Sequence, residues 1–296
     1  MKTIDATVLG DHRDELGEGP VWCTRTQSLF WVDALGRRIH RMHAATGGIS
    51  SWPLSKMPAS YALRDGGGAL LASRNGLALF DFDTGVETPL DAGVDFGNER
   101  FNDGKVDRRG RFWVGTMHRE MSRPEGWLYR VGADCRPQRV QPGVVLSNGI
   151  AWSPDDRTMY HCDSRPGQVF AYDFDADSGT VSDKRLFLDY SGQPHGPDGC
   201  TVDAEGFLWV TEVRAGRIAR YAPDATLERI VATPMMRPTS ITFGGADLGT
   251  MYITSMRMGV SAEELARNPL YGGVFVARPG VTGLPEPYHA GGASPR

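Results

Sequence analysis

One sequence pattern of alternating hydrophobic and polar positions recurs along the chain. In each copy, a glycine precedes a first apolar run, a polar turn leads to a second run rich in Trp, Phe and Val, and a third run follows. Short β-branched and aromatic runs between Asp- and Gly-rich turns are typical of β-strands. Four clear and two weaker copies begin at or near Gly19, Tyr61, Gly104, Gly149, Gly199 and Thr239.

The repeat length identifies the architecture. Each copy spans about 40–50 residues, the length of a β-propeller blade. Barrels and sandwiches do not need six similar repeats, so the pattern favours an all-β, six-bladed β-propeller, with residues 1–296 forming a single domain. Only residues 261–267 have helical periodicity, and we expect one or two turns there. Five tryptophans are expected at equivalent strand positions, where they pack between blades: Trp22, Trp31, Trp113, Trp152 and Trp209.

Composition excludes several classes of protein. The 296 residues are 40% hydrophobic and 23% charged, which is ordinary for a soluble globular protein. A net charge of -4 gives no reason to expect nucleic acid or an acidic membrane as a partner. No run approaches the ~20 apolar residues of a membrane span, and the charged N-terminus lacks the apolar core of a signal peptide.

Cysteine usage fits the same picture. The four cysteines have no close pairing and no C-x-x-C spacing, so we expect buried or loop thiols in a reducing compartment. We therefore expect a cytoplasmic protein without nucleic-acid or membrane partners. No long apolar stripe requires an obligate interface, and a monomer or a small homo-oligomer is expected.

Oxygen-bearing side chains precede the first strand of most repeats. When the copies are aligned, this position holds Glu18, Ser60, Asp103, Asn148, Asp198 and Thr239. The innermost strands of a propeller line its central channel, so these side chains should meet at one mouth. Oxygen donors without sulfur or histidine suit Ca²⁺, Mg²⁺ or Mn²⁺, while Zn²⁺ and Fe²⁺ are less favoured. The alternative is that Asp and Asn begin these strands because they form turns.

Arginines follow the second strand of five repeats, close to the same mouth. They are Arg74, Arg119, Arg165, Arg214 and Arg257. These arginines are expected either to form a solvated rim with local ion pairs or to bind an anionic or hydroxyl-rich ligand through paired hydrogen bonds. His118 and His195 fall near the mouth and are candidate substrate contacts, whereas His40 and His43 are expected at the surface. No nucleophile elbow, P-loop or dinucleotide fingerprint occurs.

Five motifs together resemble the gluconolactonase, regucalcin and senescence-marker-protein family of metal-dependent sugar lactonases. The resemblance runs from Leu16 to about Ala277. The segment between Arg119 and Glu125 departs from the family pattern, which leaves the specificity carried by that loop open. The motifs are Leu16-Gly17-Glu18-Gly19-Pro20, Arg100-Phe101-Asn102-Asp103-Gly104-Lys105-Val106-Asp107, Gly115-Thr116-Met117, Ser147-Asn148-Gly149 and Pro197-Asp198-Gly199.

The resemblance implies one divalent metal held by Glu18, Asn148 and Asp198. Asp198 matches the residue usually assigned as general base as well. Other positions are candidates for contact with the substrate: first Arg100 and Asn102, and with them Asp103, Glu120, Arg74, Arg119 and Arg214.

The expected reaction is hydrolysis of an aldonolactone, such as glucono-, xylono-, arabinono- or galactonolactone, to the sugar acid. The metal would polarise the lactone carbonyl while Asp198 takes a proton from water. The arginine-rich rim adds the option of a lactone carrying a sulfonate, phosphate or carboxylate. Alternatives are another metal-dependent esterase or phosphotriesterase, or a non-enzymatic Ca²⁺-binding propeller. Arg100 and Asn102 argue against the last, because an ion buffer has no use for substrate-type donors.

Overall fold

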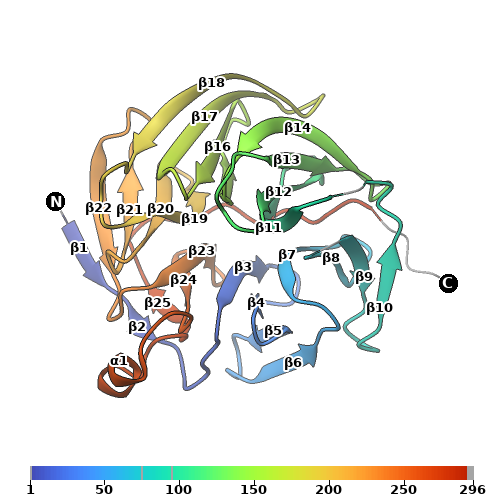
Figure 1. Cartoon of the computed structure of the whole chain (residues 1–296). Coiled ribbons are helices and arrows are strands. Elements are labelled where there is room, and N and C mark those ends of the chain that lie inside the picture. Colours follow the sequence, from blue (N-terminus) through green and yellow to red (C-terminus); the bar gives the residue numbers. More distant parts are fainter. Residues whose placement is uncertain (1, 75, 95, 292–296) are drawn as a thin grey trace.

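Six β-sheets are arranged as blades around a common centre in the computed structural model, which describes residues 2–74, 76–94 and 96–291 (Figure 1). The fold is therefore the expected six-bladed β-propeller. Within each of the first four blades, the strands run outward in chain order.

The first three blades follow one another without interruption. Blade 1 has β3 (Gly17–Cys23), β4 (Ser28–Asp33), β5 (Arg38–His43) and β6 (Ile49–Pro53). Blade 2 has β7 (Pro58–Leu63), β8 (Ala69–Ser73), β9 (Gly76–Phe80) and β10 (Glu87–Leu90). Blade 3 has β11 (Glu99–Val106), β12 (Phe112–His118), β13 (Gly126–Val131) and β14 (Pro137–Val144).

Blade 4 is built like the first three, whereas blades 5 and 6 each include a strand from the N-terminus. Blade 4 has β15 (Ser147–Trp152), β16 (Thr158–Asp163), β17 (Gln168–Asp175) and β18 (Thr180–Asp189). Blade 5 has β19 (Gly196–Val202), β20 (Leu208–Val213), β21 (Arg217–Tyr221), β22 (Leu227–Ala232) and, parallel to β22, β1 (Lys2–Asp5). Blade 6 has β23 (Pro238–Gly244), β24 (Thr250–Ser255), β25 (Phe275–Ala277) and β2 (Thr7–Val8).

The N-terminal strand closes the ring. Strand β2 pairs antiparallel with β25, and the chain then crosses to β3, so that blade 6 is completed by the segment that leads into blade 1. The sequence repeats did not predict this, because β2 has only two residues.

Tryptophans pack between neighbouring blades, as expected. Trp22 stacks on Tyr252 with 5.4 Å between ring centroids, and Trp209 meets Phe243 at 6.0 Å. Trp113 and Trp152 join blades 3 and 4 at 6.1 Å. The five tryptophans do not occupy one strand register, since two lie on first strands and the other three on second strands.

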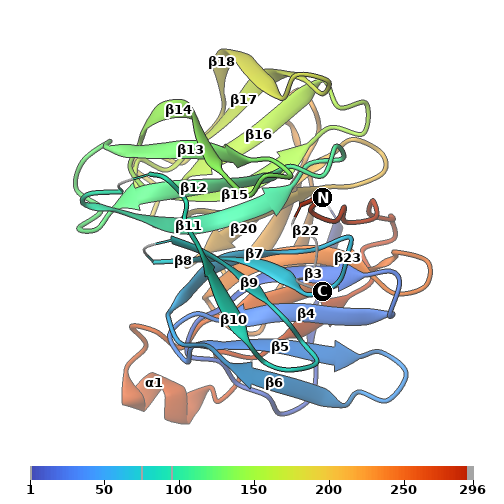
Figure 2. The ribbon, with the colours of Figure 1, turned by 90° about the vertical axis from the view of Figure 1, so that its right-hand side faces the viewer.

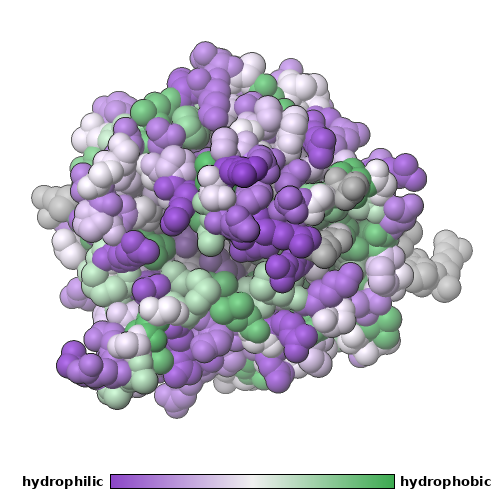
Figure 3. All heavy atoms as spheres, viewed as in Figure 1, coloured by the Kyte–Doolittle hydropathy of each residue, from purple (hydrophilic) through white to green (hydrophobic). Residues whose placement is uncertain are grey.

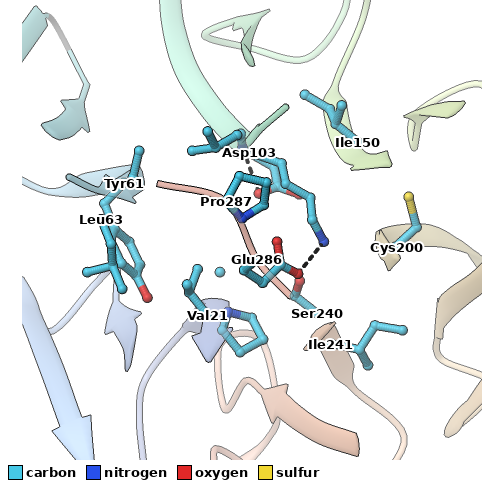
Figure 4. Close-up of a pocket in the computed structure, with 16 residues that line it drawn as sticks. Val21, Tyr61, Leu63, Asp103, Ile150, Cys200, Ser240, Ile241, Glu286 and Pro287 are labelled. Atoms are coloured by element: carbon cyan, nitrogen blue, oxygen red, sulfur yellow. Dashed lines mark hydrogen bonds and ion pairs between the residues drawn. The ribbon is translucent and has the colours of Figure 1, made fainter. Parts of the chain in front are cut away.

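The segment after β25 covers one mouth of the channel. Gly283 pairs with Asp203 and His289 pairs with Arg64, so the segment crosses from blade 5 to blade 2. Glu286 and Pro287 project into the channel from it (Figure 4), and Glu286 forms an ion pair of 2.9 Å with Lys105. Two spaces of about 30 Å³ each lie on this side among the described residues.

The single helix of the described residues, α1 (Ala262–Arg267), matches the expected turns. Ser261 caps it, because its Oγ accepts a hydrogen bond from the Glu264 N–H. Figure 2 shows α1 on the face opposite to the C-terminal segment. None of the helices in the described part of the chain is long and apolar enough to cross a membrane.

Candidate active site

A cavity of about 500 Å³ lies at the mouth opposite the C-terminal segment, and all six blades contribute to its lining. This volume is within the range of small-molecule sites. Hydrophilic side chains gather around a hollow near the centre of this face (Figure 3).

The aligned oxygen donors meet at this cavity. Glu18, Asp103, Asn148 and Asp198 all line it, each from the innermost strand of a different blade. The other two aligned positions have a different use. Ser60 Oγ donates to the Gly104 carbonyl oxygen at 3.1 Å, and Thr239 Oγ1 donates to the Gly17 carbonyl oxygen at 2.5 Å. Those hydroxyls therefore join neighbouring blades.

The three carboxyl groups form no ion pair among the described residues. Burial raises the pKa of Glu18 well above its usual range, and the charges of Asp198 and Asp103 raise it further. Burial and the charge of Asp103 likewise raise the pKa of Asp198 well above its usual range. Burial raises the pKa of Asp103 to about 6, although hydrogen bonds from backbone N–H groups oppose this. Asp198 is buried and Glu18 and Asp103 are half-buried. Three carboxyl groups whose charges oppose one another's ionisation fit a divalent-metal site.

Amide side chains orient the donor set. Asn102 Nδ2 donates to Asn148 Oδ1 at 2.7 Å and to the Ser147 carbonyl oxygen at 2.8 Å. Asn148 Nδ2 donates to Ser164 Oγ at 2.7 Å. Both amide orientations are fixed in this way, and Asn148 Oδ1 keeps a second lone pair for a cation.

Glycines follow the donor residues because neighbouring inner strands approach closely. A Cβ added at Gly149 would lie 2.5 Å from the Asp198 carbonyl oxygen, and one at Gly199 would overlap Ser240. Only Gly19, with a φ of +53°, has the left-handed backbone that favours glycine directly.

Several predicted arginines surround the cavity. Arg100, Arg165 and Arg214 line it, and Arg74 lies close enough to Arg100 that burial and the Arg74 charge together lower the pKa of Arg100. Within the described ranges, none of these four forms an ion pair, so the interpretation as a rim of local ion pairs does not hold for them. Arg100 Nη1 donates to Asn102 Oδ1 at 3.2 Å, which links the rim to the donor set.

The structure does not place the whole 119–125 loop at the cavity. Met121 lines it, but Arg119 and Glu120 are exposed outside the lining. His195 lines the cavity as expected. His118 is buried and accepts a hydrogen bond from the Glu120 N–H instead of facing the cavity.

Sequence reasoning missed the apolar wall. It is formed mainly by loop residues, and loops carry no periodic signal. Met256 stands one residue before Arg257 in the second-strand register that revealed the arginines, so that register was the available clue. The main apolar residues are Leu35, Met57, Met121, Met256 and Met258.

Comparison with known families gives a match over most of the chain. Residues 16–257 match the family described as the SMP-30/gluconolactonase/LRE-like region. The chain is 39% identical to the 6-deoxy-6-sulfogluconolactonase of Pseudomonas putida, over 93% of this chain and 95% of the relative. It is 36% identical to the L-arabinolactonase of Azospirillum brasilense, over 97% and 96% of the two chains.

A solved structure has the same architecture. It is described as a calcium-binding protein, regucalcin, from Agrobacterium tumefaciens, and it superposes with a TM-score of 0.91 at 29% sequence identity. The match covers 98% of this chain and 99% of the other.

Proposed function

Because the chain belongs to the SMP-30/gluconolactonase/LRE-like family, we propose that it is a metal-dependent lactonase that hydrolyses an aldonolactone to the free sugar acid. The observation that carries the proposal is the set of three carboxyl groups without ion-pair partners among the described residues, together with an amide, at the cavity. The similarity to sugar lactonases across more than nine-tenths of the chain supports the same reaction class.

Glu18, Asn148 and Asp198 are the proposed metal-holding residues. A divalent cation bound there supplies Lewis acidity at the lactone carbonyl oxygen. The all-oxygen donor set favours Ca²⁺, Mg²⁺ or Mn²⁺ over Zn²⁺ or Fe²⁺. The description of the Agrobacterium relative as calcium-binding is consistent with this preference.

The chain supplies proton transfer and orientation. Asp198 is the proposed general base, taking a proton from the attacking water as the bond from water oxygen to carbonyl carbon forms. The bond from that carbon to the ring oxygen then breaks, and the ring oxygen regains a proton as the hydroxyl of the product. Arg100 and Asn102 hold the lactone in place, since positioned donors remove much of the entropic barrier.

The unpaired arginines favour a lactone with an anionic substituent. Arg100, Arg165 and Arg214 line the cavity and Arg74 lies near Arg100, and none of the four has a carboxylate partner among the residues described. Guanidinium groups bind sulfonate, phosphate and carboxylate oxygens through paired hydrogen bonds. The relative that acts on 6-deoxy-6-sulfogluconolactone supports this choice, and neutral aldonolactones are the competing substrates.

A substrate panel tests the reaction class. Purified protein, supplied with divalent metal, is offered neutral aldonolactones, anionic aldonolactones, simple esters and a phosphotriester, and acid release is followed with a pH indicator. We expect turnover of aldonolactones well above the spontaneous rate and of the other two classes near background. Preferred turnover of esters or phosphotriesters would replace the lactonase assignment, and turnover of nothing would favour a binding protein.

A further inference from the structure

A second cluster of side chains that could hold a metal lies outside the cavity lining. His12, Asp14 and His40 place one ligand atom each within 4.8 Å of one another, and none of them lines the cavity. His12 Nε2 is 2.6 Å from Asp14 Oδ1, and His40 Nε2 is 3.3 Å from the same oxygen. The sequence placed His40 at the surface, but its side chain is only 1% exposed, because its ring packs against the rings of Trp31 and His12.

The inner nitrogen of His40 lacks a hydrogen-bond partner. Its Nε2 is buried and forms no hydrogen bond, while its Nδ1 lies 2.7 Å from Ser51 Oγ. When Ser51 accepts from Nδ1–H, the Nε2 lone pair faces the Asp14 carboxylate and can coordinate a cation held between them. When Nε2 carries the proton instead, His40 pairs directly with Asp14, which is the arrangement expected without a metal.

Surrounding groups hold the cluster as outer partners hold metal ligands. Trp31 Nε1 donates to Asp14 Oδ2 at 2.8 Å, which leaves Oδ1 free to point at both imidazoles. Ser51 fixes the His40 ring from the other side. Partners of this kind set the orientation of ligating carboxylates and imidazoles.

From these contacts, we propose that His12, Asp14 and His40 bind a transition-metal cation of the Zn²⁺ type, separate from the site at the mouth. Two imidazoles and a carboxylate are ligands that Zn²⁺ accepts and Ca²⁺ does not favour. Tetrahedral ligands at about 2.0–2.1 Å from zinc lie about 3.3 Å apart. The His40–Asp14 separation of 3.3 Å already has this value, whereas His12 and Asp14, now hydrogen-bonded at 2.6 Å, would move apart when zinc binds. The partly exposed His12 leaves a side open for a water as fourth ligand.

The position suggests a structural role. Asp14 N–H donates to the Gly272 carbonyl oxygen of blade 6, whereas His40 belongs to β5 of blade 1. The cation would therefore tie the crossing segment that closes the ring to the first blade.

Metal content tests this independently of the lactonase reaction. The proposed metal site at the cavity is first removed with Glu18→Gln and Asp198→Asn, which gives a mouth-disabled protein. This protein is loaded with Zn²⁺, and unbound zinc is removed before elemental analysis. We expect one zinc per chain to remain, with zinc raising the thermal unfolding midpoint. Adding His40→Gln or His12→Gln should abolish both effects, and His43→Gln, on the same strand, should abolish neither.

Two results would overturn the proposal. One is a mouth-disabled protein that retains no zinc, and the other is retention that persists in both cluster variants. His12→Gln decides the matter if His40→Gln does not fold, because the His12 side chain is 24% exposed and lies in a loop. A visible Co²⁺ spectrum of tetrahedral type, lost in His12→Gln and kept in His43→Gln, gives a second readout.

Discussion

At the scale of single residues, Asp198 carries the largest expected share of the chemistry. It is buried, lies beside Glu18 and Asp103, and receives a hydrogen bond from the backbone of Gly199. Asp198→Asn should lower kcat by about 10²–10⁴-fold, the usual worth of a general base, without changing the circular dichroism spectrum. The exposed turn variant Asp224→Asn is the control. Activity within twofold of wild type in Asp198→Asn would remove the residue from its proposed role.

Arg214 tests the preference for an anionic substrate. It lines the cavity and has no ion-pair partner among the described residues. A lost charge-assisted hydrogen bond costs about 1.5–3 kcal/mol, so Arg214→Ala should raise KM for an anionic lactone about 10–100-fold. KM for a neutral lactone should change little. Steady-state kinetics on both substrates measure the difference, with Arg257→Ala, outside the lining, as control. An equal rise in KM for the two lactones would mean that Arg214 does not bind the anionic substituent.

His161 is a source of acid sensitivity away from the chemistry. Burial lowers its pKa to about 3, below the 6.5 of an unfolded chain. The unfolded state therefore binds one more proton between pH 6.5 and 3, and stability present above pH 6.5 is lost as pH falls through this range. His161→Gln should flatten the dependence by up to about 1.4 kcal/mol per pH unit. Urea unfolding from pH 7 to 4 measures this, and parallel curves for the two proteins would contradict it.

At the scale of elements, the inner strands set the geometry of the cavity. Gly149 leaves room for the Asp198 carbonyl oxygen of the next blade. Gly149→Ala should cost about 1–3 kcal/mol of unfolding free energy through overpacking and also weaken metal binding, because it pushes β15 and β19 apart. Gly132→Ala is the matched control, since its Cβ meets only an ordinary contact at 3.5 Å. Loss of stability in both variants alike would show that inner-strand packing is not the cause.

The repeats predicted the blades well because each blade needs the same apolar alternation. The first strands begin 41 to 49 residues apart. Each begins one to four residues before the aligned position, so the aligned side chains lie within the first strands and not just before them as predicted. The register that brought Glu18, Asp103, Asn148 and Asp198 together was visible for the same reason. The apolar cavity wall and the outward position of Glu120 were not visible, because loop conformation depends on contacts that the repeat pattern does not encode.

At the scale of the whole molecule, the sequence pattern did not predict how the ring of six blades is closed. Strand β2 completes blade 6 through pairing with β25, and the segment from Gly283 to His289 covers the far mouth. Both are short segments that pair with residues far away in the sequence, and neither contains the sequence pattern that the blades repeat. The described cavity lies at the other mouth, and that mouth carries the acids and the unpaired arginines.

The most direct test of the account is the metal dependence of lactone hydrolysis. The protein is stripped with chelator, Ca²⁺, Mg²⁺, Mn²⁺, Zn²⁺ and Fe²⁺ (anaerobically) are restored singly, and acid release from an aldonolactone is followed. We predict that stripping abolishes turnover, that at least one cation restores it, and that Glu18→Gln cannot be restored by the same concentration. Full turnover in the stripped protein, unchanged by Glu18→Gln, would contradict the account.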